Sequence, residues 1–205
     1  IGKHITLTSL HEIHCAYCGK KTKKSYNQGY CYLCFIELAR NDTCVMKPEL
    51  CHFAKGTCRE PDWGIKHCMQ PHLVYLAWSS GLKVGLTKPS QIPTRWIDQG
   101  AMSAVAFAQT QSRYHAGLIE DHLRQWYNDR TNWRKMLSVH TGPEVNLIEE
   151  ALNAQNHIQS SSLPTEVLSS TLMLDLNETT LNYPITGNGP IKSMGLEKLD
   201  CIEGK

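Results

Sequence analysis

The sequence predicts an α+β protein, and three observations support this fold class. Short runs with strand-like alternation lie in the middle of the chain and near both ends. Two longer segments, residues 115–127 and 143–160, place apolar residues at helical spacing. Eight of the nine cysteines lie between positions 15 and 68, which indicates local thiol chemistry rather than an ordinary core.

The charge of the chain is unevenly distributed. Lys and Arg outnumber Asp and Glu by 10 to 6 in residues 1–72 and by 8 to 4 in residues 73–142, but residues 143–205 hold 3 against 9. A basic body of +8 followed by an acidic tail of −6 favours a polyanion, DNA or RNA, as partner. The acidic tail offers a surface to a protein partner as well.

We expect a cytoplasmic protein that makes no contact with a membrane. No run approaches the roughly 20 apolar residues that span a bilayer. Nothing resembling a signal peptide precedes the cysteines, and four disulfides would leave Cys201 over, so reduced thiols are favoured. The start at Ile1 and the end inside a strand-like pattern predict a fragment of a longer protein.

The first cysteine group consists of two CxxC pairs, Cys15 with Cys18 and Cys31 with Cys34, separated by twelve residues. Each CxxC turn offers two thiolates from one tight loop, with backbone amides facing the sulfurs. Two such turns complete the tetrahedron that zinc requires, as in a zinc ribbon or a treble-clef-like site. We predict a structural Zn²⁺ here, in a closed site with no open position for catalysis.

The loop between the two pairs carries four lysines, Lys20, Lys21, Lys23 and Lys24. A loop that the metal holds rigid can bind the phosphates of a nucleic acid. A solvated loop whose charge serves solubility explains the same composition equally well, so both interpretations stay open.

The second cysteine group, Cys44, Cys51, Cys58 and Cys68, is widely spaced and contains no CxxC. An irregular segment of roughly 25 residues with few apolar side chains needs something else to order it. We favour a second zinc, bound by four cysteines or by three cysteines and a histidine. An iron–sulfur cluster is the alternative, and buried free thiols are the third possibility. The histidines at 52, 67 and 72 are expected beside the site rather than as ligands.

Residues 73–78 and 82–87 are strand-like runs joined by a three-residue loop, which predicts an antiparallel hairpin. Closing the loop pairs Leu76 with Val84 and Tyr75 with Gly85. Alternation then assigns one face to the core and the other to a half-polar surface. The core face carries Val74, Leu76, Trp78, Leu82, Val84 and Leu86, and the half-polar face carries Tyr75, Ala77, Lys83, Gly85 and Thr87.

Three further elements are expected after the hairpin. Pro93 suits a first helical turn and Gly100 a C-terminal stop, so a short helix carrying Arg95 lies between them. Residues 104–110 predict a third strand. Residues 115–127 predict an amphipathic helix with Glu120 at the edge of its buried face. That buried face comprises Ala116, Ile119, Leu123 and Trp126.

This order of elements resembles the GIY-YIG endonuclease superfamily. A strand with a tyrosine precedes a strand ending in x-Val-Gly, then come a helix with an arginine, a strand, a helix with a glutamate, and an asparagine. The resemblance implies that Tyr75 is the base that activates water, that Arg95 binds the scissile phosphate and that Glu120 holds Mg²⁺ or Mn²⁺. Asn132 falls at the position of the later asparagine.

The two named motifs of that superfamily are altered here. The first reads LVY at residues 73–75 and the second reads KVG at residues 83–85, so Lys83 replaces the second tyrosine. On the same face as Tyr75, this lysine is expected either to lower the pKa of the phenol or to bind phosphate. The replacement bears on catalysis more than on the fold.

Other segments resemble an uncharacterised bacterial family known only as a domain of unknown function. They read NQGYCYLCF at residues 27–35, PELCHF at 48–53, TCREP at 57–61 and PTRWIDQG at 93–100. This resemblance covers about residues 1–140 and implies no activity.

The predicted organisation has five parts. Residues 1–14 hold a strand that pairs with the tail, residues 15–72 form a zinc-ribbon-like module, and residues 73–142 form a GIY-YIG-like domain with a three-stranded antiparallel sheet. Residues 143–162 add a helix and a linker, and residues 163–205 form part of a small β module with the chain start.

The sequence thus predicts a zinc-containing protein that binds nucleic acid and cleaves a phosphodiester with a divalent metal. The residues assigned to cleavage are Tyr75, Lys83, Arg95, Glu120 and Asn132. The alternative is a non-catalytic, zinc-stabilised module that binds nucleic acid or a protein partner.

Overall fold

The computed structural model describes residues 4–27, 29–130, 132, 143–169, 171–173, 175–183 and 201–204. The chain divides into two compact units, residues 1–42 with 190–205 and residues 43–189. The predicted module of residues 15–72 spans this boundary, so the two cysteine groups lie in different units. In the described part of the chain, no helix is long and apolar enough to cross a membrane.

The first unit is made of short elements. β1 (Ile5–Thr8) pairs antiparallel with β9 (Cys201–Gly204), which joins the start of the chain to its tail. β2 (Ile13–His14) and β3 (Lys21–Thr22) form a second antiparallel pair, and the turn between them contains the first CxxC. α1 (Tyr32–Glu37) begins at the second CxxC, and a 3₁₀ turn (Ala39–Asn41) follows it.

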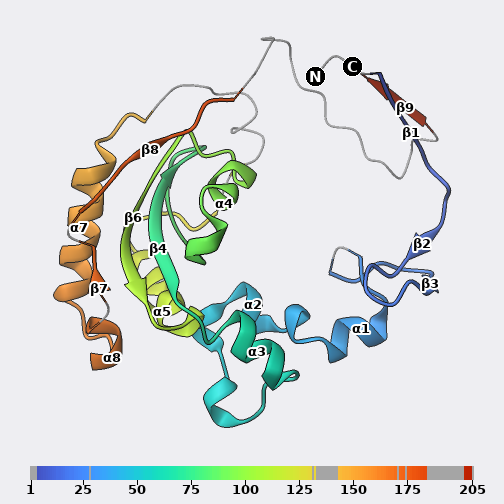
Figure 1. Ribbon diagram of the computed structural model, residues 1–205, viewed down its shortest axis with the longest axis horizontal. Coiled ribbons are helices and arrows are strands. Elements are labelled where there is room, and N and C mark those ends of the chain that lie inside the picture. Colours follow the sequence, from blue (N-terminus) through green and yellow to red (C-terminus); the bar gives the residue numbers. More distant parts are fainter. Residues whose placement is uncertain are drawn as a thin grey trace. The chain divides into compact units, whose positions relative to one another are not determined.

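The second unit is built on a five-stranded antiparallel sheet in the order β5-β4-β6-β7, with β8 also paired to β6 (Figure 1). Its strands are β4 (His72–Trp78), β5 (Leu82–Thr87), β6 (Ser103–Thr110), β7 (Thr171–Leu172) and β8 (Thr179–Thr180). The three long strands are those that the sequence predicted.

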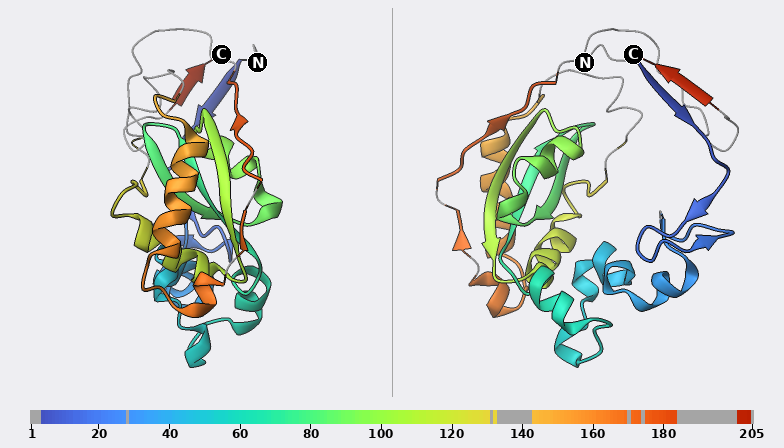
Figure 2. Two further views of the ribbon diagram at one scale, coloured as in Figure 1. Left: turned by 90° about the vertical axis from the view of Figure 1, so that its left-hand side faces the viewer. Right: turned by 45° about the vertical axis from the view of Figure 1, so that its right-hand side comes forward.

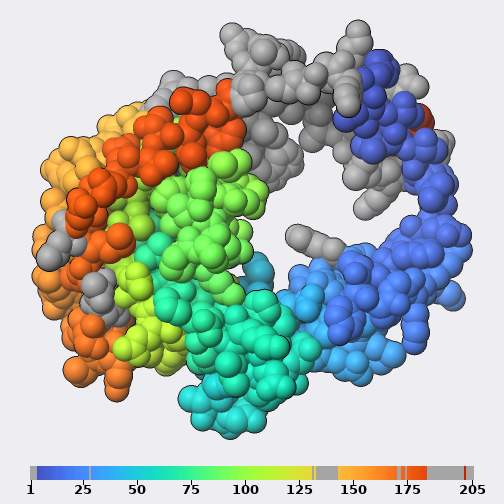
Figure 3. Space-filling model, in the orientation of Figure 1, coloured from blue at the N-terminus to red at the C-terminus, as the bar shows by residue number. Residues whose placement is uncertain are grey.

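The prediction of three strands, with the tail strands in a separate module, is wrong for β7 and β8. Both pair with the edge of β6 that β4 leaves free. The space-filling view in Figure 3 shows the segment that carries them, in dark orange, lying along this side of the unit. These two-residue strands carry no alternation strong enough to indicate their partner from sequence.

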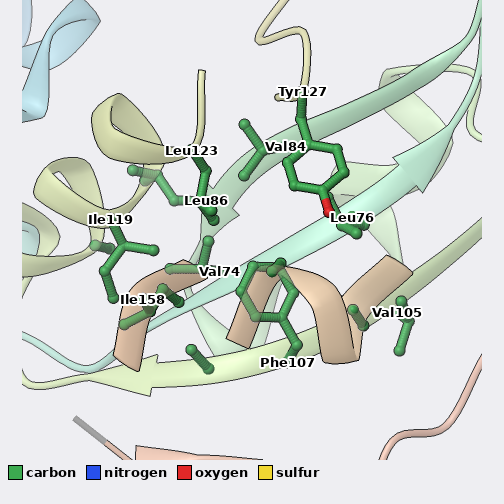
Figure 4. Packing of buried hydrophobic residues seen from close by; sticks show 14 of the residues in the cluster. Val74, Leu76, Val84, Leu86, Val105, Phe107, Ile119, Leu123, Tyr127 and Ile158 are labelled. Carbon is green, nitrogen blue, oxygen red and sulfur yellow. The ribbon is translucent and has the colours of Figure 1, made fainter. Parts of the chain in front are cut away.

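The predicted register of the hairpin is confirmed, since Leu76 pairs with Val84 and Tyr75 with Gly85. One face of the sheet therefore turns a continuous apolar surface inward (Figure 4). α5 (Arg113–Leu123) and α7 (Leu147–Gln159) cover this face. The sheet residues in this core include Val74, Leu76, Val84, Leu86, Val105 and Phe107.

The opposite face of the hairpin was predicted to be a half-polar surface, and this is wrong because it is buried. α4 (Thr94–Asp98) and the segment after it lie across this face, on the side of the sheet away from α7 (Figure 2). Trp96 and Ala101 pack there against Tyr75 and Ala77. The polar groups on this face are thereby removed from bulk water.

The predicted helix of residues 115–127 is shorter than expected. Ala116, Ile119 and Leu123 are buried as predicted, but α5 ends at Leu123. Trp126, predicted to face inward, is 48% exposed, and Tyr127 enters the core instead. The end of the helix changes the direction of the chain, so helical spacing no longer applies at Trp126.

The segment that contains the second cysteine group is attached to α5. It holds α2 (Thr43–Met46), α3 (Pro61–His67) and two 3₁₀ turns, at Pro48–Leu50 and Phe53–Lys55. A third 3₁₀ turn (Pro89–Gln91) precedes α4, and α8 (Thr165–Leu168) follows α7.

Gly117 of α5 is the point of closest approach to this segment. A Cβ at this position would lie 2.5 Å from Pro48 Cβ and 2.8 Å from the backbone nitrogen of Glu49. Arg113, at the start of α5, donates from its backbone to Cys68 and from Nη2 to the carbonyl of Val45, at 2.8 and 2.7 Å. The Cys-rich segment is therefore held against α5 by the close contact at Gly117 and by hydrogen bonds from Arg113.

We expect Gly117→Ala to lower the free energy of unfolding by about 1–3 kcal/mol, because a methyl group would collide with the backbone at residues 48 and 49. In an uncrowded helix the same change would stabilise the protein by up to about 1 kcal/mol. Urea unfolding measures whether Gly117→Ala lowers or raises the free energy of unfolding. Asn153→Ala, at an exposed position of α7, is the control, and a stabilised Gly117→Ala variant would contradict the close contact.

Candidate functional site

The four cysteines of the first group converge on one point, and their sulfur atoms all lie within 4.8 Å of one another. Cys15 and Cys18 come from the β2–β3 turn, Cys31 precedes α1, and Cys34 lies in the first turn of α1. The Sγ atoms of Cys18 and Cys31 are 3.8 Å apart. That equals the edge of a tetrahedron with metal–sulfur distances of about 2.3 Å, as in zinc sites.

The electrostatics of this group also suit a metal. Backbone N–H groups of Cys18, Cys31 and Tyr17 donate to the Cys15 sulfur and lower its pKa to about 6. Burial, with the neighbouring sulfurs, raises the pKa of Cys34 to about 12. Four sulfurs this close together repel one another when they lose their protons, and a bound cation offsets the repulsion between the thiolates. The group can hold a metal ion such as Zn²⁺.

The lysines between the two pairs are exposed in the structure. Lys21 forms an ion pair with Glu12, and Lys24 lies over the ring of Tyr26, 5.1 Å from its centroid. Neither contact buries the charge.

The second cysteine group does not converge in the same way. Burial raises the pKa of the Cys68 thiol, and the nearby Cys51 and Cys58 add to this rise. The Cys44 sulfur lies within 4.8 Å of a ring nitrogen of His52. Among the described residues, however, no three of these four sulfurs lie within 4.8 Å of one another. A second metal, as zinc or in an iron–sulfur cluster, stays a prediction.

In the second unit, Tyr75 lies directly over Gly85. A Cβ at position 85 would stand 2.7 Å from both Cζ and the hydroxyl oxygen of Tyr75. The hydroxyl donates to Oε1 of Gln99 at 2.8 Å, and Trp96 contacts the ring edge-on. The missing side chain at Gly85 therefore makes the space that the phenol occupies.

The expectation that Lys83 lowers the pKa of this phenol is not met. Burial raises the pKa of Tyr75, and the Arg95 guanidinium opposes that rise only in part. The phenol is therefore a neutral hydrogen-bond donor at ordinary pH.

Lys83 is 4% exposed, which is unusual for a lysine. Burial, helped by the charge of Arg95, lowers its pKa to about 8, while Glu120 and Asp129 act in the opposite direction. Asp129 reaches this site because the chain after α5 runs beside β5, where the backbone N–H of Val84 donates to the carbonyl of Asn128 at 2.8 Å. A lysine in this state can lose its proton near neutral pH.

Glu120 lies on α5 in a group of charges. Burial raises the pKa of Glu120 to about 7, although Arg124 and Arg113 oppose the rise. Arg124 lies among four carboxylates, at 3.6 Å from Glu49, 4.0 Å from Glu120, 2.9 Å from Asp121 and 3.1 Å from Asp129.

The structure thus brings together four of the five residues assigned to cleavage. The charges of Arg95 and Glu120 both act on Tyr75 and on Lys83. Arg95 is exposed. Asn132 is exposed too, and its backbone N–H donates to Ser80 Oγ in the hairpin loop at 2.9 Å. This contact places Asn132 at the loop end of the hairpin.

Sequence reasoning missed Glu49 and Asp129. Glu49 reaches the site through the close contact at Gly117, and Asp129 through the pairing beside β5. Both contacts join segments that no periodic pattern relates. The isolated glycine inside the predicted helix was the one available signal for Glu49, because such a residue often marks a close approach of another backbone.

Comparison with known protein families finds a family model that matches this chain. The model described as "Protein of unknown function (DUF2797)" matches residues 2–205. The chain belongs to this family. The match extends over both units, beyond the residues of about 1–140 that carry the sequence resemblance to an uncharacterised family. No curated protein and no solved structure matches the chain.

We expect the purified protein to contain one metal ion that depends on the first cysteine group. Replacing Cys15 and Cys34 together by Ser should lower the metal content by about one ion per chain, because two ligands cannot hold a structural zinc. Elemental analysis measures this. Cys201→Ser, at an exposed cysteine outside the group, should leave the content unchanged, and an unaltered content in the double variant would exclude the site.

The pKa of Glu120 predicts a pH dependence of stability. It is raised from 4.5 to about 7 on folding, so the folded state binds the extra proton between these values. The cost in folding stability of ionising Glu120 is therefore absent below about pH 4.5 and complete above about pH 7.

Glu120→Gln should therefore be more stable than the parent protein at pH 8, on the order of 2 kcal/mol. The two proteins should converge as the pH falls to 4.5. Denaturant unfolding across this range, without added divalent metal, measures the difference. Glu149→Gln, at an exposed carboxylate of α7, is the control, and a difference that grows at low pH would contradict the shift.

Proposed function

We propose that this protein binds nucleic acid and that its second unit cleaves a phosphodiester bond with a divalent metal. One observation carries the proposal. Tyr75, Lys83, Arg95 and Glu120 come from β4, β5, α4 and α5, and the charges of Arg95 and Glu120 act on both Tyr75 and Lys83. The resemblance to the GIY-YIG superfamily, which rests on the order of these elements, implies this same combination of groups.

Each residue has a chemical role in the proposed reaction. Arg95 is exposed and always charged, so it is suited to bind the phosphate. Glu120, with Asp129 and Glu49 near it through their shared contact with Arg124, supplies oxygen ligands of the kind that Mg²⁺ or Mn²⁺ prefers. Bound there, the ion would polarise the phosphoryl oxygen and lower the pKa of a coordinated water.

The physical chemistry favours Lys83 over Tyr75 as the group that accepts the proton of the attacking water. A general base works best when its pKa lies near the operating pH. Lys83 has a pKa of about 8, whereas burial raises that of Tyr75 above its ordinary value of 10. We therefore assign Tyr75 to positioning, through its hydroxyl and its contact with Gly85. The proton passes to Lys83 and is returned to the leaving oxygen.

A comparison of Lys83→Arg with the parent protein tests this role. Arginine keeps the positive charge and can bind phosphate, but it does not give up its proton. Labelled single-stranded, duplex and branched DNA and RNA would be incubated with Mg²⁺ or Mn²⁺. We expect cleavage to fall by about 10²–10⁴ in Lys83→Arg and to disappear in Glu120→Ala.

The pH profile separates the roles further, since the parent rate should rise as Lys83 deprotonates near pH 8. Glu149→Ala is the matched control for Glu120→Ala. Absence of cleavage on every substrate, or cleavage unaltered in Glu120→Ala, would exclude the nuclease. An active Lys83→Arg variant would exclude only the proton transfer.

A second candidate function is non-catalytic binding of nucleic acid by the same fold. It is favoured by Arg124, which neutralises the carboxylates around Glu120 without a metal, and by the complete burial of Tyr75. Under this alternative, the protein retards nucleic acid in a gel, retardation weakens steeply as salt rises, and no substrate is cut.

A further inference from the structure

Each CxxC turn of the first unit carries an exposed tyrosine. Tyr17 lies between Cys15 and Cys18, and Tyr32 lies between Cys31 and Cys34; both residues are 55% exposed. The sulfurs of these turns point to a common centre, so the intervening side chains are directed outward. Burial in a core therefore does not account for aromatic residues at these two positions.

The two tyrosines belong to neighbouring parts of the surface. Tyr17 precedes Cys18 and Tyr32 follows Cys31, and the sulfurs of these cysteines are 3.8 Å apart. The turns also touch through their backbones, where the N–H of Ala16 donates to the carbonyl of Gly29 at 2.7 Å. A ligand of a few nucleotides is long enough to reach both rings.

One cation lies over Tyr17, and a second lies over the ring that contacts Tyr32. The Arg40 guanidinium lies over Tyr17, 5.3 Å from the ring centroid. Tyr32 meets the edge of Tyr26 at 5.5 Å, and Lys24 lies over Tyr26 at 5.1 Å. Stacking of Tyr26 on Phe35, with centroids 5.8 Å apart, holds this second group in place. We call Tyr17, Lys24, Tyr26, Tyr32 and Arg40 the knuckle surface.

Positive charge next to exposed rings determines the kind of ligand. Phosphates of a nucleic-acid backbone are attracted by Lys24, Arg40 and the exposed lysines at 20, 21 and 23, while unpaired bases stack on tyrosine. In a duplex the base faces are already stacked on one another, so only a single strand can use the rings. We propose that the knuckle surface binds single-stranded nucleic acid by stacking bases on Tyr17 and Tyr32.

This inference rests on the proposed binding of nucleic acid and is independent of cleavage. The test uses the full chain without added Mg²⁺ or Mn²⁺ and three fluorescent probes: a 15-nucleotide oligothymidylate, an abasic oligomer of equal length, and a duplex. We expect tighter binding of oligothymidylate than of either other probe in fluorescence anisotropy, because only it offers free bases.

One double variant, Tyr17→Leu/Tyr32→Leu, removes both rings and is called the Leu pair. A second double variant, Tyr17→Phe/Tyr32→Phe, keeps both rings and is called the Phe pair. The Leu pair should bind oligothymidylate about 20-fold more weakly or worse, since each stacked base accounts for roughly a 5- to 150-fold change. Its affinity for the abasic oligomer should not change, and the Phe pair should behave as the parent protein. Metal content, measured for every variant, verifies that the first unit is intact.

Equal affinity of the parent protein for oligothymidylate and the abasic oligomer would overturn the proposal while leaving nucleic-acid binding in place. So would a preference for the duplex, or a Leu pair that keeps its preference for bases. Binding of none of the probes would overturn both this inference and the proposed function, and would direct attention to a protein partner for the exposed rings. Loss of cleavage in Glu120→Ala has no bearing on any of these outcomes.

Discussion

The pairing of Tyr75 with Gly85 is the contact on which the second unit depends. It sets the register between β4 and β5, and in a sheet the register decides which side chains face the core. A shift of β5 by one residue against β4 would turn Leu82, Val84 and Leu86 away from α5 and α7 and bring Lys83 onto the core face. The phenol lies over Gly85, where any side chain would overlap the ring, so this register requires glycine opposite Tyr75.

The same register creates an electrostatic strain. Once α4 covers the face of Tyr75, Lys83 is buried with it, and its charged form loses hydration. The carboxylates of Glu120 and Asp129 stabilise the charged lysine in part. The pKa of Lys83 nevertheless stays low, and that of Glu120 stays high. Each group is poorly stabilised in its charged form at neutral pH. Buried charges that persist in this condition are more typical of chemical sites than of structural ion pairs.

The two cysteine groups serve the protein in different ways. The first gathers four sulfurs within a short stretch whose hydrophobic cluster is small, so a metal would provide most of the order there. The second lies in a segment already attached to α5 by Arg113 and by the contact at Gly117. That attachment brings Glu49 to Arg124. Whatever binds the second group would therefore act on a segment that contributes to the charged site.

Some of these features could be predicted from the sequence, and others could not. Local spacing was sufficient to predict that the sulfurs of the first cysteine group converge, because CxxC turns impose their geometry within a few residues. The hairpin register was predictable too, because a three-residue loop leaves little freedom. The exposed position of Trp126 was not, since it follows from where α5 ends, and helical spacing contains no information about that end beyond its capping residues.

By itself, then, the sequence determined the four-sulfur group, the three long strands and the order of Tyr75, Lys83, Arg95 and Glu120 along them. Only the tertiary structure decided that these four would be brought together, with Arg95 exposed and the other three largely buried, and with Arg124 and the carboxylates of Glu49 and Asp129 beside Glu120. It also decided that β7 and β8 would complete the sheet. The physical reason is range: turn geometry and alternation act over a few residues, whereas burial and Coulomb interactions depend on segments far apart in the chain that meet only after folding.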